Sequence, residues 1–363
     1  MALPDLPPDA VPVGGRIAHA HDDLRRLFAQ FATGECRGYS PFYEAIALRI
    51  ADDAEVLRLS AGARPEQRPP NLLFGATHLL VLRGEAPRLA PWYERLRRGE
   101  GVAGDDAWPD FRATCLEHAR VLAETVATRR VQTNEAGRIV ALRPAIATAF
   151  DPLPAAGVAL VEVGASAGLN LHMDAHRCRY RLADGSTKES GPHDARLVVD
   201  CELRGAGVPP LSFPRVASRR GVDLDPVDVT DDDAVLWLRA LVWPDQPGRD
   251  LRLRAAVETV REDPPAIERG DAVEVLPRIL ASLPRGAPAC VYHSAVRHQL
   301  TRAQCQALDR AVDDANRDRP TAYVQAESPA GGPFDLLVRP PGERNARLVG
   351  RSHAHGAWVE WLA

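Results

Sequence analysis

Four groups of residues that could hold a ligand or move a proton lie in or directly after short apolar runs from residue 159 onward. In chain order they are Glu162 with Gly164 and Gly168, Asp223 or Asp225, Asp271, and His293 with Ser294. Carboxylates accept hydrogen bonds from hydroxyl and amino groups, and histidine can exchange a proton near neutral pH. The pattern predicts one composite site for a polar ligand, if the fold brings these positions to one edge.

The first group lies in the stretch Leu160–Asn170. Ala159–Val163 predicts a buried strand, the residues of Gly164–Gly168 are all small, and the pattern after them is typical of a short helix. Glycine has no Cβ, so the backbone N–H groups of such a loop can approach a ligand closely. A carboxylate such as that of Glu162 is costly to bury without a cationic partner, which predicts a role in ligand binding.

A sheet is needed to align these positions. From about residue 158, strand-like apolar runs alternate with helical patterns, which is typical of a mostly parallel sheet with helices on both faces. In such a doubly wound, Rossmann-like α/β fold the ligand lies beyond the carboxyl ends of the strands, where all four groups occur. The turn residues Asp184-Gly185 predict a hairpin insertion near 177–203, in which 177–182 pairs with 196–203. An antiparallel hairpin is also predicted around 340–342.

The region before the sheet has helical periodicity and no convincing strand. The sequence therefore predicts an N-terminal α-helical domain at 1–150 and a sheet domain at 151–363. A dense polar segment at 131–138 joins them, and it is either a hinge and capping segment or part of a surface that binds the substrate. The residues assigned to that surface are Asn134, Glu135, Arg138, Tyr43 and His78.

The composition argues against several classes of function. A formal net charge of -4 is not that of a general nucleic-acid or anionic-membrane binder. The six cysteines are widely spaced and the first residues do not resemble a signal peptide, so we expect a cytoplasmic protein with buried free thiols. No apolar run is long enough to span a bilayer. The histidine pairs His172 with His176 and His353 with His355 lack an obvious third ligand, so no metal site is predicted; the oligomeric state stays open.

The glycine loop and the ordered acids resemble the class I S-adenosylmethionine (SAM) methyltransferases over roughly residues 155–363. That family has an acid followed by Gly-x-Gly-x-Gly after its first strand, and this chain has Ser166 at the position of the central glycine. The resemblance implies SAM as the cofactor, bound by Glu162, Gly164, Ser166 and Gly168. It also implies that Asp223, or in second place Asp225, binds the ribose hydroxyls and that Asp271 reaches the adenine amine.

Over nearly its full length the chain also resembles an uncharacterised bacterial family, the domain-of-unknown-function 2332 group. The segments that carry this resemblance are Ser40–Glu44, Pro70–Phe74, Gln132–Glu135, Val161–Leu171 and Trp243–Gln246. The resemblance names no reaction, and it supports the architecture more than the function.

Three functions stay open at this point. The first is a methyltransferase acting on a small-molecule acceptor, with His293 as the base that removes a proton from the acceptor. The second is a non-catalytic protein that binds SAM or a nucleotide-like ligand. The third takes Gly164–Gly168 as the Gly-x-Ser-x-Gly elbow of an α/β-hydrolase, with Ser166 as nucleophile and Asp271 and His293 or His353 as partners. Such an elbow should follow several strands, whereas the region before residue 158 has a helical pattern.

Overall fold

The computed structural model describes residues 19–328 and 332–363, and it divides the chain into two compact units. Unit 1 comprises the described residues up to Thr133 and the segment Leu236–Asp250; unit 2 comprises Asn134–Val235 and Leu251–Ala363. The helical unit therefore ends before residue 150 and includes a later segment, which the sequence did not predict. No helix in the described ranges is both long enough and apolar enough to cross a bilayer.

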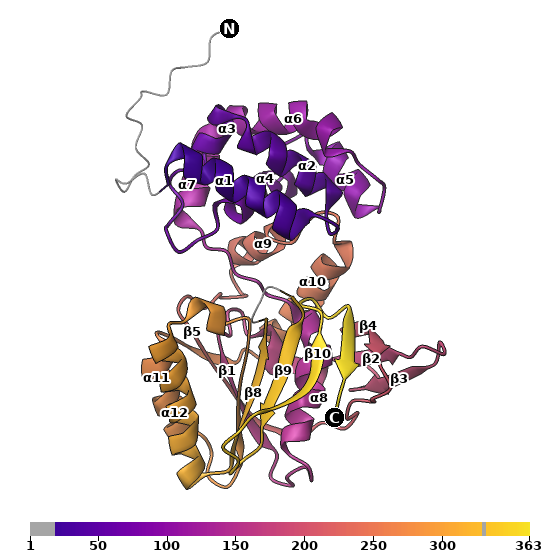
Figure 1. Cartoon of the computed structure of the whole chain (residues 1–363), viewed down its shortest axis with the longest axis vertical. Helices are drawn as coiled ribbons and strands as arrows, with labels where there is room; N and C mark the ends of the chain where they lie inside the picture. Colours follow the sequence, from indigo (N-terminus) through magenta and orange to yellow (C-terminus); the bar gives the residue numbers. More distant parts are fainter. Residues whose placement is uncertain (1–18, 329–331) are drawn as a thin grey trace. The chain divides into compact units, whose positions relative to one another are not determined.

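Unit 1 is built from helices (Figure 1). In chain order they are α1 (His21–Phe31), the π-helical turn η1 (Ala32–Cys36), α2 (Pro41–Ala51), α3 (Ala54–Arg58), α4 (Pro69–Leu82), α5 (Ala90–Arg97), α6 (Gly104–Glu117) and α7 (Ala119–Thr128). Local sequence explains where they start: the hydroxyl of Ser40 accepts the N–H of Tyr43 at 3.2 Å, and Pro41 occupies the first turn of α2. Helix α4 is buried along nearly its whole length, as its apolar sequence predicts.

Unit 2 contains an 11-stranded sheet within the described residues. Its strands are β1 (Val158–Val163), β2 (Arg177–Arg181), β3 (Thr187–Ser190), β4 (Val198–Arg204), β5 (Val216–Asp223), β6 (Ala266–Arg269), β7 (Ala289–Ser294), β8 (Thr321–Glu327), β9 (Phe334–Arg339), β10 (Arg347–Ser352) and β11 (Trp358–Trp361). The spatial order is β3-β2-β4-β11-β10-β9-β8-β7-β1-β5-β6.

The strand order changes direction at β1. The pairs β1–β5, β5–β6, β1–β7 and β7–β8 are all parallel, so the chain builds outward from β1 first on one side and then on the other. Strands β8 to β11 then pair antiparallel in succession, and the hairpin predicted around 340–342 joins β9 to β10. The prediction of an α/β protein with a mostly parallel sheet is confirmed at this level.

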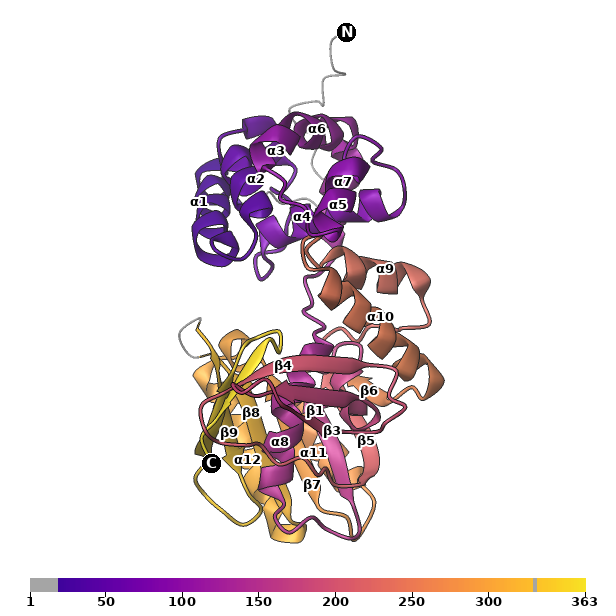
Figure 2. The ribbon, with the colours of Figure 1, turned by 90° about the vertical axis from the view of Figure 1, so that its right-hand side faces the viewer.

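Helices cover both faces of the central strands (Figure 2). Helices α11 (Ala272–Ser282) and α12 (Arg302–Asp318) pack on one face, over a core that includes Val161, Val163 and Val291. Helix α8 (Ile139–Ala149) packs against β8 and β9 on the opposite face. This packing places α8 in the sheet unit and explains why the helical unit ends at Thr133. Helices α9 (Asp232–Ala240) and α10 (Pro247–Glu262) contain the other two boundaries between the units.

The inserted hairpin pairs differently from the prediction. Strand β2 pairs antiparallel with β3, and the N–H of Gly185 closes the turn by donating to the carbonyl oxygen of Leu182 at 3.0 Å. Strand β4, which was predicted to be the hairpin partner, runs parallel to β2 and to β11. Strand β3 is a short, polar edge strand, and its sequence Thr-Lys-Glu-Ser has no apolar alternation by which it could be recognised.

Candidate ligand-binding site

The loop Gly164–Gly168 leaves β1 at the carboxyl edge of the sheet and meets the turn after β7. The N–H of Gly164 donates to the carbonyl oxygen of Val222 at 2.9 Å. Gly164 has a φ of +73°, and a Cβ at this position would lie 2.6 Å from Cγ2 of Val296. Glycine alone tolerates both this conformation and this approach. The loops that flank the reversal of strand order therefore pack directly together.

Ser166 forms the tip of the loop in a left-handed backbone conformation, with φ of 49°. Its N–H donates to Oδ2 of Asp223 at 2.8 Å, while Oδ1 of Asp223 accepts the N–H of Asp225 at 2.8 Å. Among the described residues, Ala295 is the other non-glycine residue with a positive φ, and it follows β7. Backbone strain of this kind often marks ligand sites, because only a well-packed surround maintains it.

Asn134 holds the same loop from the other side. Its Nδ2 donates to the hydroxyl of Ser166 at 2.8 Å, and its Oδ1 accepts the N–H of Ala167 at 3.2 Å. The tip of the loop is thus fixed by two side chains, Asn134 and Asp223. The sequence predicted both as site residues, although it assigned them to different ligands.

Glu135 and Arg138 extend this arrangement. The buried carboxylate of Glu135 accepts the N–H of Gly137 at 2.8 Å and pairs with Arg252 at 3.2 Å. Nη1 of Arg138 donates to the hydroxyl of Ser294 at 2.9 Å and to its carbonyl oxygen at 3.2 Å. The segment predicted to be either hinge or binding surface therefore braces the loops after β1 and β7.

Glu162 lies beneath the glycine loop and is 2% exposed. Its Oε1 accepts from Nδ2 of Asn170 at 3.4 Å, and its Oε2 accepts from the hydroxyl of Tyr292 at 3.5 Å. Both distances are long for hydrogen bonds to a charged group. Burial is the main cause that raises the pKa of this carboxyl to about 8. The side chain is therefore largely protonated at neutral pH.

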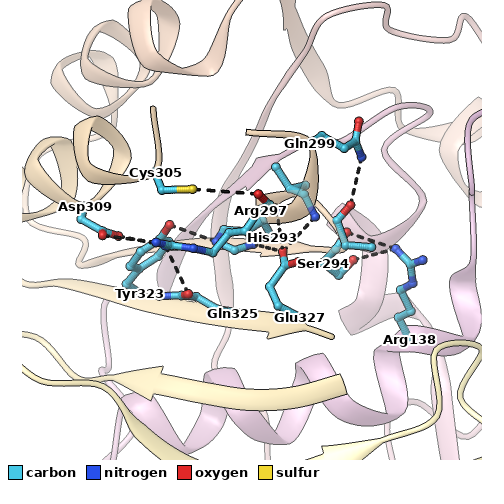
Figure 3. A network of polar contacts seen from close by, with 12 residues as sticks. Arg138, His293, Ser294, Arg297, Gln299, Cys305, Asp309, Tyr323, Gln325 and Glu327 are labelled. Atoms are coloured by element: carbon cyan, nitrogen blue, oxygen red, sulfur yellow. Dashed lines mark hydrogen bonds and ion pairs between the residues drawn. The ribbon is translucent and has the colours of Figure 1, made fainter. Parts of the chain in front are cut away.

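His293 lies on the opposite face of the sheet from Glu162. Tyr292 pairs with Glu162 and His293 pairs with Val163, so His293 points toward the core beneath α11 and α12. The side chain is 0% exposed; Nδ1 lies 2.6 Å from Oε1 of Glu327, and Nε2 lies 2.9 Å from the hydroxyl of Tyr323 (Figure 3). With both ring nitrogens engaged, this geometry does not favour the predicted role as a base.

The buried network around His293 supports the turn after β7. Oε1 of Glu327 also accepts the N–H of Val296 at 2.8 Å and that of Arg297 at 3.2 Å (Figure 3). Burial opposes ionisation of Glu327, but the hydrogen bonds from His293 and from these two backbone groups outweigh it and lower the pKa of the carboxyl. The carboxylate thus positions Val296 against Gly164.

Asp271 lies at the same edge as the glycine loop, since it follows β6 and the N–H of Gly270 donates to the carbonyl oxygen of Asp223 at 2.9 Å. Its Oδ1 accepts the N–H of Val273 at 2.8 Å and so caps α11, and its Oδ2 accepts from Gln304 at 3.3 Å. The capping bond explains the acid at this position without a ligand.

A family model described as "Uncharacterized protein conserved in bacteria (DUF2332)" matches residues 25–361. The chain belongs to the DUF2332 family. No curated protein and no solved structure matches the chain. The full-length resemblance that was inferred from the five sequence segments is therefore confirmed, whereas the likeness of the sheet unit to methyltransferases is a prediction.

Two predicted binding residues of this DUF2332 protein lie in the core of the helical unit. The ring of Tyr43 packs 4.1 Å from that of Phe74, and Nδ1 of His78 lies 3.0 Å from the carbonyl oxygen of Ala240. Both side chains are buried, and burial is the main cause that lowers the pKa of His78 to about 4. Core packing accounts for the burial of both residues, and their assignment to the substrate surface stays a prediction.

The hydrolase arrangement is not assembled in this member of the family. Ser166 Oγ bonds to Asn134, His293 lies on the far face of the sheet, and Asp271 caps a helix. The ring of His353 packs against His355 in the turn between β10 and β11. Across the two described ranges, no group of three or more His, Cys, Asp and Glu side chains could hold a metal ion.

Sequence reasoning missed two residues of the site, Glu327 and Asn170. Glu327 is an acid at the carboxyl end of a buried strand, which is the same signal that identified Glu162 and Asp223. Asn170 is a buried amide between Leu169 and Leu171 in the turn η3 (Leu169–Ala175). Its Oδ1 is buried and has no hydrogen-bond partner within the described residues.

Proposed function

We propose that the sheet unit binds SAM at the carboxyl ends of β1, β5 and β7 and that the protein is a methyltransferase for a small-molecule acceptor. The observation that carries the proposal is the placement of the glycine loop. It lies where the strand order reverses, which is where open, doubly wound sheets of the Rossmann type bind nucleotide-like ligands.

The residues around the loop fit the parts of SAM. Asp223, at the end of β5, retains acceptor capacity for ribose hydroxyls beyond its two backbone bonds. The neighbouring Leu224 is 64% exposed, and the flat apolar face of an adenine would cover it. The carboxyl of Glu162 and the side-chain Oδ1 of Asn170 offer buried acceptors to an ammonium group. Asp271 would contact the adenine amine only while also capping α11.

When bound, SAM supplies an activated methyl group, so the protein's main task is to align the acceptor with it and to exclude water. Asn134, Asp223 and Glu327 hold the loops at the required positions before the ligand enters. Arg138 and Ser294 lie at the carboxyl end of β7 and would face the acceptor. A base for the acceptor is not assigned, because His293 is engaged on both nitrogens.

That engagement favours a second candidate, a non-catalytic protein that binds SAM or a similar nucleotide. The two candidates share the binding site and differ in turnover. Formation of S-adenosylhomocysteine (SAH) with any member of an acceptor panel would support the enzyme. Tight binding of SAM without SAH formation across the panel would support the binding protein.

Calorimetric titration of the full-length protein with SAM tests the shared site. We expect Asp223→Ala and Glu162→Ala each to abolish measurable binding. Asp228→Ala is the matched control: this acid is exposed on the same loop, and its Oδ1 accepts the N–H of Thr230 at 2.8 Å. Unchanged affinity in both site variants, with melting curves that confirm folding, would remove the cofactor assignment.

A further inference from the structure

The buried pair Glu162 and Asn170 is incompletely satisfied. Glu162 is 2% exposed and Asn170 is 8% exposed, yet they share one long hydrogen bond of 3.4 Å, and Oδ1 of Asn170 has no partner within the described residues. Leaving a buried acceptor without a donor costs free energy, because its hydrogen bonds to water are lost. Such a cost is expected where a ligand supplies the missing donor.

The surroundings keep Glu162 neutral while the site is free. The groups from neighbouring elements that act on it are Asn170 of η3, Arg138 of η2 (Ala136–Arg138), Asp223 of β5 and Tyr292 of β7. Arg138 favours the ionised form, but its Nη1 is bonded to Ser294, and Asp223 opposes ionisation. Burial is the strongest influence and raises the pKa to about 8. Within the described residues, the donors to the carboxyl of Glu162 are the amide of Asn170 and the hydroxyl of Tyr292, and both donors are uncharged.

We propose that the ammonium group of the ligand donates to Glu162 and to Oδ1 of Asn170, and that its entry expels the proton of Glu162. The neutral carboxyl becomes a carboxylate, the proton passes to solvent, and the ligand keeps its positive charge. This inference rests on the proposed function, because it takes SAM and its relatives as the ligands. It adds that the site selects ligands with an ammonium group and that their binding is linked to pH.

The two protonation states of Glu162 determine the direction in which ligand affinity changes with pH. Below pH 8 the free protein carries a proton that the complex lacks, so affinity rises by up to about tenfold for each pH unit. Above the pKa of the carboxyl in the free protein, the proton is already lost, so affinity no longer rises with pH. A ligand without the ammonium group has no effect on the charge of Glu162, and its affinity is independent of pH over this range.

Proton release can be counted directly by calorimetry. The full-length protein is titrated with SAH at pH 7.0 in phosphate, HEPES and imidazole, whose ionisation enthalpies differ. The slope of binding enthalpy against buffer enthalpy should correspond to about one proton released per SAH bound. The wild-type protein with 5′-methylthioadenosine, which lacks the ammonium group, should release none.

Glu162→Gln is the matched variant, because it preserves shape and removes the titrating proton. It should bind SAH more weakly and without proton release. Should this variant fail to fold, the proton release of the wild type with SAH and with 5′-methylthioadenosine still tests the inference. Binding of SAH with no proton release would overturn this inference alone. Failure of both SAM and SAH to bind would overturn the proposed function and this inference with it.

Discussion

The amide of Asn134 fixes the tip of the glycine loop by contacting Ser166 at 2.8 Å and the adjoining N–H of Ala167 at 3.2 Å. Asn134 is the first residue of unit 2, directly after the boundary at Thr133. The residue at which the chain enters the sheet unit therefore also shapes the loop that we propose to hold the ligand.

Asn134→Ala should weaken SAM binding about tenfold, equivalent to about 1.4 kcal/mol. The physical reason is that the loop must then be ordered by the ligand. Hydrogen exchange at residues 164–168 should accelerate in the free variant. Thr133→Ala, an exposed neighbour, is the control. Equal affinity and equal exchange in the two variants would show that Asn134 does not order the loop.

Glu327→Ala should lower the free energy of unfolding by about 3 kcal/mol, because His293 and two backbone N–H groups lose a buried acceptor. Glu327→Gln, which keeps a neutral acceptor, should lose less. The pKa of Glu327 is lowered in the folded state, so its stabilising contribution is present above the unfolded pKa and disappears as pH falls. Urea unfolding of both variants at pH 7 and pH 4 measures this. A Gln variant with the same pH dependence as the wild type would contradict the assignment.

Glu162→Gln should become increasingly stabilising, relative to the wild type, as pH rises. The folded protein holds a proton on Glu162 up to a pKa of about 8, whereas the unfolded chain releases it near the ordinary value of 4.5. Between these values the wild type loses stability by up to about 1.4 kcal/mol for each pH unit. Thermal or urea unfolding of the ligand-free proteins from pH 5 to 7.5 tests this. Parallel stability curves would mean that Glu162 is ionised in the free protein.

Ser166→Gly should be more stable than Ser166→Ala by about 1 kcal/mol, because both remove the hydroxyl but glycine alone relieves the left-handed backbone. Both variants lose the hydrogen bond to Asn134, so the difference between their free energies of unfolding in urea measures the backbone strain alone. A fluorophosphonate probe supplies a second readout: we expect no labelling of Ser166 in the wild type. Labelling that Ser166→Ala removes would reinstate the hydrolase.

Residues close together in the chain were predicted well. The strand Val158–Val163, the loop after it and the acids that end β5 and follow β6 were all recognised, because apolar runs and small-residue loops are local patterns. The face of the sheet to which a strand residue points was harder to predict. A shift of one residue exchanges the two faces, and this is why His293 was placed with the site although it points to the core beneath α11 and α12.

The partners of each element depended on distant parts of the chain. The return of 236–250 to the helical unit, the parallel pairing of β4 with β2, and the burial of Tyr43 and His78 leave no local signal. The SAM assignment, the small-molecule acceptor and the cytoplasmic location are predictions that await the measurements above.

By itself, the amino-acid sequence determined the family, the α/β class and the chemical types available at the strand ends, since these depend on local pattern and composition. Tertiary structure decided which of those groups meet. Asn134, Ser166 and Asp223 converge at one edge, while Glu162 and His293 are separated by the sheet itself. The reason is physical: strand register and helix packing set the direction of each side chain, and they are fixed by contacts between residues far apart in the chain.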